Sequence, residues 1–314
     1  MRFLVTGGAG FIGRWVVKKL LSDGNDVWVL DNLSNSAKSN LDEFASDSKF
    51  HGLSIGSVED SKCVQDSFRN RYDICIHSAA QINVQDSLDN PERTFNTNVI
   101  GTYNILKCAL KSKTKVTVIG TCMVYDTSQH KGISELSPVK PASPYAGSKL
   151  SAENLALSYY YGLGLPIIIL RPFNTYGPFQ KTTMEGGVVS IFIHNKLQGE
   201  KLRIFGDGTQ TRDFLYVEDC ADFIVKATFS DKAIGQIINA GLGIDISIND
   251  LAFLICKDTN RIERVKNPHP HSEIPKLLCA NTKARKILNW QPKTTLEEGI
   301  LRTELWINHR GGVK

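Results

Sequence analysis

Short apolar runs alternate with longer amphipathic segments along the first half of the chain. Most of the longer segments carry apolar residues at helical spacing, and the short runs have the length of strands. This repeated order of strand and helix predicts an α/β fold of the Rossmann type, with a doubly wound parallel sheet. The strands are expected at residues 2–6, 26–30, 51–55, 74–77, 115–119 and 166–170.

The rhythm changes after about residue 170. Loops rich in glycine, threonine and proline now separate short apolar pieces such as 187–194 and 219–227. We therefore expect one region over 1–170 and a smaller, mixed α/β region over 171–314, with an approximate boundary and segments that could interleave. Ligands of open parallel sheets bind at the carboxyl ends of the strands, so the second region should supply a substrate pocket there.

The composition is that of an ordinary soluble globular protein. The chain has 314 residues, of which 22% are charged and 41% hydrophobic, and its net charge of +5 is spread without a long basic block. Nucleic acid is therefore not predicted as a partner. No stretch reaches about 18 unbroken apolar residues, and glycines interrupt the first apolar run, so neither a membrane span nor a signal peptide is predicted.

Cysteine and histidine usage bears on the compartment and on metals. The seven cysteines form no CxxC pair, so neither a zinc ribbon nor a disulfide framework is predicted, and a reducing cytoplasm is the expected location. Among the seven histidines, His269 and His271 alternate on a proline-broken segment without a third partner nearby. No metal site is predicted.

The first strand leads into a glycine-rich loop, TGGAGFIG at residues 6–13, and a helix should follow it. The glycines let the chain turn, let the backbone approach a pyrophosphate and let the helix press on the strand. Asp31, after the second strand, could accept bonds from ribose hydroxyls and would repel a 2′-phosphate, which favours NAD over NADP, although Lys38 leaves some room for NADP. The alternative is a glycine-rich turn in some other α/β protein. The expected cofactor contacts here are Gly7, Gly10, Phe11, Ile12, Gly13, Asp31 and Asn32.

A tyrosine and a lysine lie four residues apart in SPYAGSK at 143–149, which opens a predicted helix. At this spacing Tyr145 and Lys149 share one helix face. A nearby ammonium and a positive nicotinamide ring would both lower the pKa of the phenol, so Tyr145 could take a proton from a sugar hydroxyl while hydride leaves to NAD. The alternative is a surface pair without a catalytic role.

Six motifs in order carry a resemblance that covers nearly the whole chain. They are TGGAGFIG at 6–13, HSAAQ at 77–81, NTNVIGT at 96–102, YAGSK at 145–149, RPFNTYGP at 171–178 and GDGTQTRDFLYVED at 206–219. Together they resemble the extended short-chain dehydrogenase/reductase family, the NAD-dependent nucleotide-sugar epimerases and dehydratases. The resemblance implies NAD as cofactor, a UDP-sugar substrate, and a homodimer formed through helices at 96–111 and 144–162.

The resemblance also implies roles for individual residues of the site. At the reacting sugar, Thr121 would bind the 4-hydroxyl, Tyr145 would be the base and Val189 would pack near it. At the cofactor, Lys149 would hold the nicotinamide ribose, Ala79 and Ala80 would line the cleft, and Asn98 would brace it. The substrate diphosphate would be held by Asn174 and Arg212. Two alternatives stay open, because Asn98 could satisfy local backbone groups and Arg212 could pair with Asp213.

The chain departs from the family pattern at two places. Where relatives commonly carry an aspartate that meets the adenine, it has Gly56-Ser57-Val58, so Ser57 or the backbone beside Val58 would make that contact. Where relatives often place a second arginine near the diphosphate, it has only Asn-Pro-His-Pro-His at 267–271. A histidine there would bind phosphate less firmly near neutral pH because it is mostly uncharged, and an exposed proline-rich loop is an equal alternative.

The segment GTCMVYD at 120–126 lies where a strand should end and the site should begin. Family members that dehydrate across C4 and C6 carry Thr-Asp-Glu there, with the aspartate as acid and the glutamate as base, whereas this chain has Thr121-Cys122-Met123. Methionine transfers no proton, and a thiol with a pKa of about 8.5 is a different acid from a carboxyl. An ordinary 4,6-dehydratase is therefore not predicted.

Two interpretations of this segment remain. In the first, which we expect, Cys122 is the acid or base at C5 or C6 after oxidation at C4, as in the atypical dehydratases that handle UDP-N-acetylglucosamine 5,6-ene, which the triplet resembles. In the second, the enzyme is a UDP-hexose or UDP-N-acetylhexosamine 4-epimerase that needs Thr121, Tyr145 and NAD, and Cys122 is a small buried residue. A regulator without catalysis is not favoured, because Tyr145 and Lys149 are both present.

Overall fold

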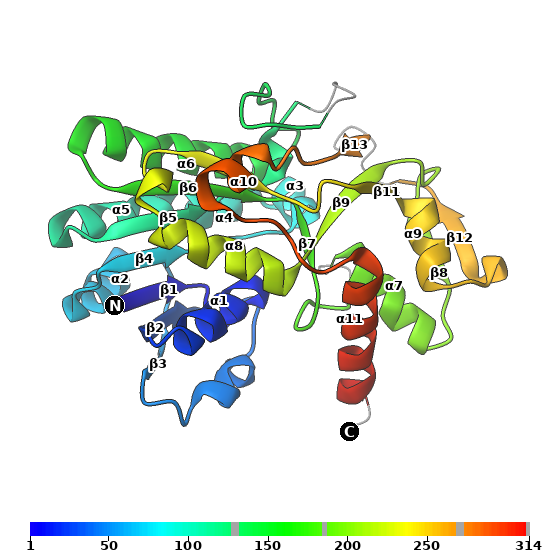
Figure 1. The fold of residues 1–314 in the computed structure, drawn as a ribbon, viewed down its shortest axis with the longest axis horizontal. Coiled ribbons are helices and arrows are strands. Elements are labelled where there is room, and N and C mark those ends of the chain that lie inside the picture. The colour runs from blue at the N-terminus through cyan, green and yellow to red at the C-terminus, as the bar shows by residue number, and fades with distance from the viewer. Residues whose placement is uncertain (127–131, 184–186, 268–272, 312–314) are drawn as a thin grey trace.

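A seven-stranded parallel sheet forms the larger part of the computed structural model, which describes residues 1–126, 132–183, 187–267 and 273–311 (Figure 1). Its order is β10-β6-β5-β4-β1-β2-β3, so the chain runs outward from β1 in one direction and then in the other. The predicted Rossmann-type fold is confirmed, and no predicted strand end is more than two residues from the observed one. The strands are β1 (Arg2–Thr6), β2 (Asp26–Asp31), β3 (Phe50–Ile55), β4 (Ile74–His77), β5 (Lys115–Ile119), β6 (Ile167–Pro172) and β10 (Ile237–Ala240).

Helices cover both faces of this sheet. On one face lie α1 (Phe11–Ser22), α8 (Val217–Phe229) and α10 (Thr282–Leu288), and on the other lie α2 (Ser61–Ser67), α5 (Gly101–Ser112) and α6 (Pro144–Leu163). Successive side chains of a strand point to opposite faces. Phe3 and Val5 accordingly join the apolar cluster under α1 and α8, whereas Leu4 joins the cluster under α5 and α6. Burial on both faces explains why the strands read as unbroken apolar runs.

The smaller region lies at one end of the large sheet (Figure 1). It contains a four-stranded sheet ordered β11-β9-β13, with β7 paired to β9, and a separate pair of β12 and β8. Buried apolar residues of its helices and strands, among them Phe192, Phe214 and Leu251, form a core of their own. Its elements are β7 (Asn174–Tyr176), α7 (Val188–Leu197), β8 (Leu202–Phe205), β9 (Thr211–Tyr216), β11 (Asp245–Ser247), α9 (Ile248–Ile255), β12 (Ile262–Val265), β13 (Lys276–Leu277) and α11 (Leu296–Gly311).

The two regions interleave along the chain. Strand β10 pairs in parallel with β6, and α8 packs on α1, although both follow residue 170 in sequence. The division of the chain at residue 170 stays a prediction. The structure shows in addition that β10 and α8, which follow residue 170, belong to the large sheet and its helical layer. None of the described helices combines the length and the apolar composition that crossing a bilayer requires.

Helix α1 packs against the glycine-rich loop so closely that a side chain at Gly13 has no room. A Cβ atom at Gly13 would lie 2.1 Å from the Gly7 carbonyl oxygen, whereas a Cβ at Gly162, in α6, would have no neighbour within 4 Å. We expect Gly13→Ala to lower the free energy of unfolding by about 1–3 kcal/mol, through overpacking. Gly162→Ala, the matched control, should raise it by up to about 1 kcal/mol, through helix propensity. Urea denaturation measures both, and equal stability of Gly13→Ala and wild type would contradict the close contact.

Candidate active site

A cleft of about 1550 Å³ crosses the carboxyl ends of the parallel strands. Residues that follow β1, β2, β3, β4, β5 and β6 form its floor. The smaller region closes it with side chains of α7, α11 and β9, including His194, Trp306 and Arg212. The cleft therefore lies between the two regions, where the sequence predicts a pocket.

The glycine-rich loop forms one edge of the cleft. Gly7 has a φ of +69°, and a Cβ there would lie 2.7 Å from the backbone nitrogen of Ala79, so the two loops cross too closely for a side chain. Gly10 precedes α1, and no side chain caps the first turn of that helix. Uncapped N–H groups at a helix start favour an anion such as a pyrophosphate. All five predicted loop contacts line the cleft, namely Gly7, Gly10, Phe11, Ile12 and Gly13.

The end of β2 supplies a buried carboxylate beside this loop. Asp31 is 7% exposed and lines the cleft together with Asn32. Its Oδ2 accepts the N–H of Ala9 at 3.0 Å, and its Oδ1 accepts the N–H of Leu33 at 2.8 Å and the hydroxyl of Ser36 at 3.1 Å. A carboxylate has about four acceptor sites, so one stays available for a ribose hydroxyl. The loop and Asp31 together fit a dinucleotide.

The segment after β3 reaches the cleft at some residues and not at others. Gly56 and Val58 line the cleft, as do Ala79 and Ala80, but Ser57 does not. Its hydroxyl instead accepts the backbone N–H of Glu59 at 3.3 Å. The adenine contact of Ser57 or of the backbone beside Val58 stays a prediction.

Helix α6 brings the tyrosine and lysine to the end of β5. Ser143 caps the helix by accepting the N–H of Ala146 at 3.2 Å. Tyr145 and Lys149 are 9% and 7% exposed and line the cleft with Thr121. The Lys149 ammonium donates to the Ile119 carbonyl at 2.5 Å. Both residues therefore belong to the cleft wall, which excludes the alternative of a surface pair.

The expected lowering of the phenol pKa is wrong for the protein alone. Burial raises the pKa of Tyr145 to about 12, although a hydrogen bond with Thr121 lowers the pKa because it favours the phenolate. Burial also lowers the pKa of Lys149 to about 8, while the Glu153 carboxylate raises it. The ammonium bonds a backbone carbonyl rather than the phenol, so the phenolate still lacks a positive neighbour.

Cys122 lines the cleft as a protonated thiol. The residue is 3% exposed, and burial raises its thiol pKa to about 12, although the Arg212 guanidinium lowers it. At neutral pH a thiol of this pKa holds its proton. The role of Cys122 as an acid or base stays a prediction, and a protonated thiol favours the acid.

A buried ion pair lies directly beneath these residues. Glu153 and Arg171 are 1% and 3% exposed, and Glu153 Oε2 accepts from Arg171 Nη2 at 2.6 Å and from Nε at 3.0 Å. Sequence reasoning missed this pair. The sequence spacing could have indicated Glu153 but not Arg171, because Tyr145, Lys149 and Glu153 recur every four residues and share one face of α6.

The two residues expected at the substrate diphosphate both line the cleft. The buried Oδ1 of Asn174 has no hydrogen-bond partner among the described residues. Arg212 donates to the carbonyls of Thr211 and Ile274 at 2.9 and 2.7 Å and to Glu273 Oε1 at 2.8 Å. Three of its five N–H donors are thus used, and two stay available for an anion.

The alternative pairing of Arg212 with Asp213 is not found. Asp213 is fully buried and faces away, where its carboxylate accepts the backbone N–H groups of Leu242, Gly243 and Cys279. Burial raises the pKa of this carboxyl to about 6. The ion-pair partner of Arg212 is Glu273, which lies 61 residues away in sequence.

Neither Asn98 nor Val189 lines the cleft. Asn98 accepts the N–H of Gln81 at 2.8 Å and donates to the Gln81 carbonyl at 3.0 Å and to Ser148 Oγ at 2.9 Å. These bonds connect the segment after β4 to α6, so they are not purely local backbone bonds, and a role of Asn98 at the cofactor stays a prediction. Val189 lies on the buried side of α7, in the core of the smaller region, because that face of the helix turns away from the cleft.

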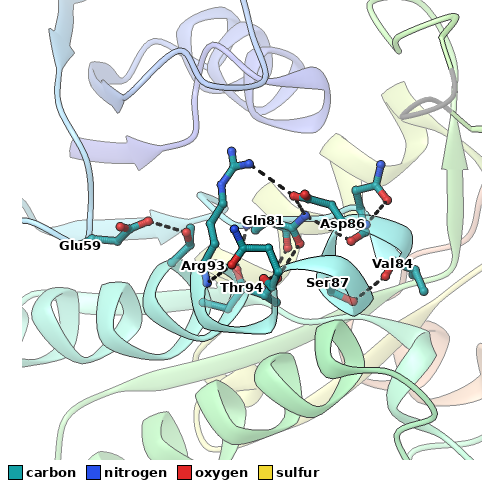
Figure 2. A network of polar contacts seen from close by, with 11 residues as sticks. Glu59, Gln81, Val84, Asp86, Ser87, Arg93 and Thr94 are labelled. Carbon is teal, nitrogen blue, oxygen red and sulfur yellow. Dashed lines mark hydrogen bonds and ion pairs between the residues drawn. The ribbon is translucent and has the colours of Figure 1, made fainter.

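A polar network on the cleft wall also escaped the sequence reasoning (Figure 2). It involves α3 (Val84–Asp89) and α4 (Pro91–Phe95), which follow β4. Gln81 Nε2 donates to Asp86 Oδ2 at 2.6 Å, and Arg93 Nη1 lies 3.4 Å from the same oxygen. In Figure 2 the labelled Glu59 lies at the far end of the network, where its carboxylate accepts the hydroxyl of Thr97.

His269 and His271 lie outside the described residues, as does most of the segment 267–271. Within the part of the chain that is described, no group of three or more His, Cys, Asp and Glu side chains is placed to hold a metal ion.

The fold and the cleft define a Rossmann-type protein with a dinucleotide site next to a Thr/Tyr/Lys group. Residues 4–303 match the family of GDP-mannose 4,6 dehydratase. The chain belongs to this family, within the extended short-chain dehydrogenases/reductases, and the predicted family is confirmed. It is 36% identical to a UDP-glucose 4-epimerase of Mycolicibacterium smegmatis, over 96% of this chain and 97% of the relative. It is 32% identical to a UDP-N-acetyl-alpha-D-glucosaminuronate decarboxylase of Bacillus cytotoxicus, over 97% of each.

Solved structures agree with this membership. Pal from Bacillus thuringiensis is 57% identical with a TM-score of 0.97, over 99% of this chain and 100% of that one. UDP-glucose 4-epimerase of Thermotoga maritima, solved with UDP-glucose, is 33% identical with a TM-score of 0.92, over 99% of each chain. The dTDP-glucose 4,6-dehydratase DesIV of Streptomyces venezuelae, solved with NAD and TYD, is 28% identical with a TM-score of 0.93, over 99% of this chain and 98% of that one. The predicted cofactor is thus confirmed at the level of the family.

Removal of one partner of the buried ion pair should be costly. Glu153→Gln leaves the Arg171 cation unpaired in the interior, and we expect the free energy of unfolding to fall by about 3–5 kcal/mol. The matched control is Glu304→Gln, which breaks the partly exposed pair of Lys196 and Glu304, 2.7 Å apart, and should cost about 0–1 kcal/mol. Chemical denaturation measures both, and equal losses would show that the buried pair contributes no more than a surface one.

Proposed function

We propose that the protein is an NAD-dependent enzyme that oxidises C4 of a UDP-N-acetylglucosamine-type sugar and then acts across C5 and C6, with a 5,6-unsaturated sugar as substrate. The observation that carries this proposal is the Cys122 thiol, buried in the cleft next to Thr121 with its pKa raised to about 12. Elimination of a 6-hydroxyl needs a base at C5 and an acid at O6. A single protonated thiol supplies one proton, which is what saturation of a 5,6-ene requires.

The cofactor part of the proposal rests on the glycine loop, the uncapped start of α1 and the Asp31 carboxylate. Family structures solved with NAD support it. NAD, when bound, would take a hydride from C4 and return it to C6. Lys149 would hold the nicotinamide ribose, and the positive ring would supply the charge that the Tyr145 phenolate lacks in the protein alone.

The side chains of this protein would then move two protons. Tyr145, hydrogen-bonded with Thr121, would take the proton of the 4-hydroxyl as the C4–H bond breaks. Once C4 is a ketone, the 5,6 double bond is conjugated with it and accepts hydride at C6. Cys122 would give its proton to C5, and the proton taken by Tyr145 would restore the thiol. The substrate and the 4-keto-6-deoxy product are isomers, so no water or external reductant is consumed.

The smaller region would hold the nucleotide. Arg212 has two N–H donors available in the cleft, and Asn174 presents a buried acceptor without a partner among the described residues. A permanently charged guanidinium suits a diphosphate. Glu273 would keep the Arg212 side chain in position.

A 4-epimerase is the second candidate function. The likeness to UDP-glucose 4-epimerases of M. smegmatis and T. maritima favours it. That reaction needs the Thr121 hydroxyl, Tyr145 and NAD, and gives Cys122 no part. The two candidates differ in whether C5 exchanges its hydrogen with solvent.

Solvent deuterium and a thiol variant separate the candidates. In deuterium oxide the wild type should convert UDP-N-acetylglucosamine 5,6-ene to a 4-keto-6-deoxy sugar with one deuterium at C5. We expect Cys122→Ser to slow this at least about 100-fold, through loss of the general acid. Cys220→Ser is the matched control, because Cys220 is fully buried with its thiol pKa also raised to about 12 but lies off the cleft. Mass and proton spectra give rate and label.

Three results would contradict the 5,6-ene conversion. One is an unlabelled C4 epimer from UDP-N-acetylglucosamine or UDP-glucose with no reaction of the ene, which would support the epimerase. Another is full activity of Cys122→Ser. A third is full activity of Tyr145→Phe, which would exclude both candidates.

We also propose a homodimer and a cytoplasmic location. All seven cysteines are free thiols, in keeping with a reducing compartment. Along α4, α5 and α6, large apolar side chains are exposed, among them Phe95, Tyr103 and Tyr161 at 50%, 41% and 75%. An exposed apolar face of this kind is typical of a protein interface.

Sedimentation equilibrium tests the dimer. The wild type should sediment at twice the mass of the chain, and Tyr103→Glu should shift it toward the monomer, because a carboxylate is costly in an apolar interface. Phe253→Glu is the control, since Phe253 is 54% exposed on α9 in the smaller region. A wild type that stays monomeric at high concentration would sink the proposal.

A further inference from the structure

The outer end of the cleft, beyond β2, is the part where the sequence predicts an adenine contact only from Ser57 or from the backbone beside Val58. Strand β3 lies next to β2 at the edge of the large sheet, and Gly56, Val58 and Glu59 follow it on the cleft wall. Asp31 at the end of β2 fits a ribose, and the Thr121 and Tyr145 group lies on the far side of β1. A dinucleotide that spans the strand ends would therefore place its adenine beside β3.

Glu59 is held rigidly at this end by α5. The Asn104 side chain, 5% exposed, donates to the carbonyls of Val58 and Glu59, each at 3.0 Å. Gly101 presses so closely on Val58 that an added Cβ would lie 2.6 Å from it. The backbone that presents Glu59 is thus fixed from below by two hydrogen bonds and a tight packing contact.

The Glu59 side chain is positioned as well. The Thr97 hydroxyl donates to Oε1 of Glu59, which Figure 2 labels, and Thr97 also lines the cleft. No ion pair involves Glu59 among the described residues. A glutamate carboxylate only accepts hydrogen bonds, so its other oxygen offers an acceptor to a ligand that carries an N–H donor.

We propose that Glu59 accepts a hydrogen bond from the 6-amino group of the cofactor adenine and selects for adenine at this end of the cleft. The proposal rests on the NAD cofactor of the proposed function. It assigns to Glu59 the contact that the family pattern gives to an aspartate two positions earlier, where this chain has Ser57 with its hydroxyl turned to a backbone N–H.

The base itself provides the test, because hypoxanthine differs from adenine at this group. Nicotinamide hypoxanthine dinucleotide carries a 6-oxo acceptor in place of the 6-amino donor, and an acceptor facing a carboxylate repels it. We expect cofactor-free wild type to bind NAD about tenfold more tightly than the hypoxanthine analogue, as for one hydrogen bond to a charged group. Calorimetric titration gives both dissociation constants without any catalytic readout.

Substitution of Glu59 should remove the preference. In Glu59→Gln an amide can accept from adenine or donate to hypoxanthine, so we expect the two dissociation constants to agree within about twofold. Thr97→Val, which keeps the carboxylate but removes its anchoring hydroxyl, should give an intermediate ratio. Two controls should keep the wild-type ratio: Ser57→Ala, and Glu92→Gln, which removes the same charge from an exposed position of α4 outside the cleft lining.

The possible outcomes distinguish the role of Glu59 from the identity of the cofactor. A wild type that binds both dinucleotides equally overturns the role of Glu59 while leaving NAD as cofactor, and so does a ratio unchanged in Glu59→Gln or lost in Ser57→Ala. A wild type that binds neither dinucleotide overturns the proposed function together with this inference. If Glu59→Gln does not fold, the wild-type ratio and Thr97→Val still test the contact.

Discussion

The contact between helix α6 and the carboxyl end of β5 is the constraint on which the site depends. Three side chains one turn apart make it. Tyr145 reaches the Thr121 hydroxyl, Lys149 donates to the Ile119 carbonyl, and Glu153 lies under Gly120, where an added Cβ would be 2.1 Å from Oε1. Gly120 is thus required for close approach, and the positions of the reactive hydroxyl and thiol follow from packing between one helix and one strand.

This arrangement buries charge that a stable core would avoid. Lys149, Glu153 and Arg171 are each at most 7% exposed, within a few residues of the cleft. A buried ion pair contributes little to the free energy of folding. We therefore expect its main contribution to be the orientation of neighbouring side chains. The carboxylate keeps Lys149 charged against desolvation, and the arginine stacks over Tyr125 with 4.7 Å between its guanidinium carbon and the ring centroid. The network therefore fixes the geometry of the cleft wall and favours the charged form of Lys149.

The sequence predicts those features that are set by neighbours along the chain. Six strands were found from apolar runs, and the loop at 6–13 and the pair Tyr145 and Lys149 were found from local spacing. Strand β10 was missed because it joins the sheet only through β6, far back in the chain. The partners of Arg212 and Glu59 were missed for the same reason, since Glu273 and Thr97 lie 61 and 38 residues away.

Burial affects the protonation of the Cys122 thiol differently from that of a carboxyl in similar surroundings. Asp213, close enough to influence the Cys122 thiol, has a carboxyl pKa raised to about 6 even with three N–H donors. A carboxyl in such surroundings changes its protonation near neutral pH and can act as acid or base. The thiol starts from a higher pKa, and burial takes it to about 12, so it stays protonated across the physiological range. A protonated thiol suits the donation of a proton, so the burial of one side chain supports the proposed role of Cys122 as an acid at C5.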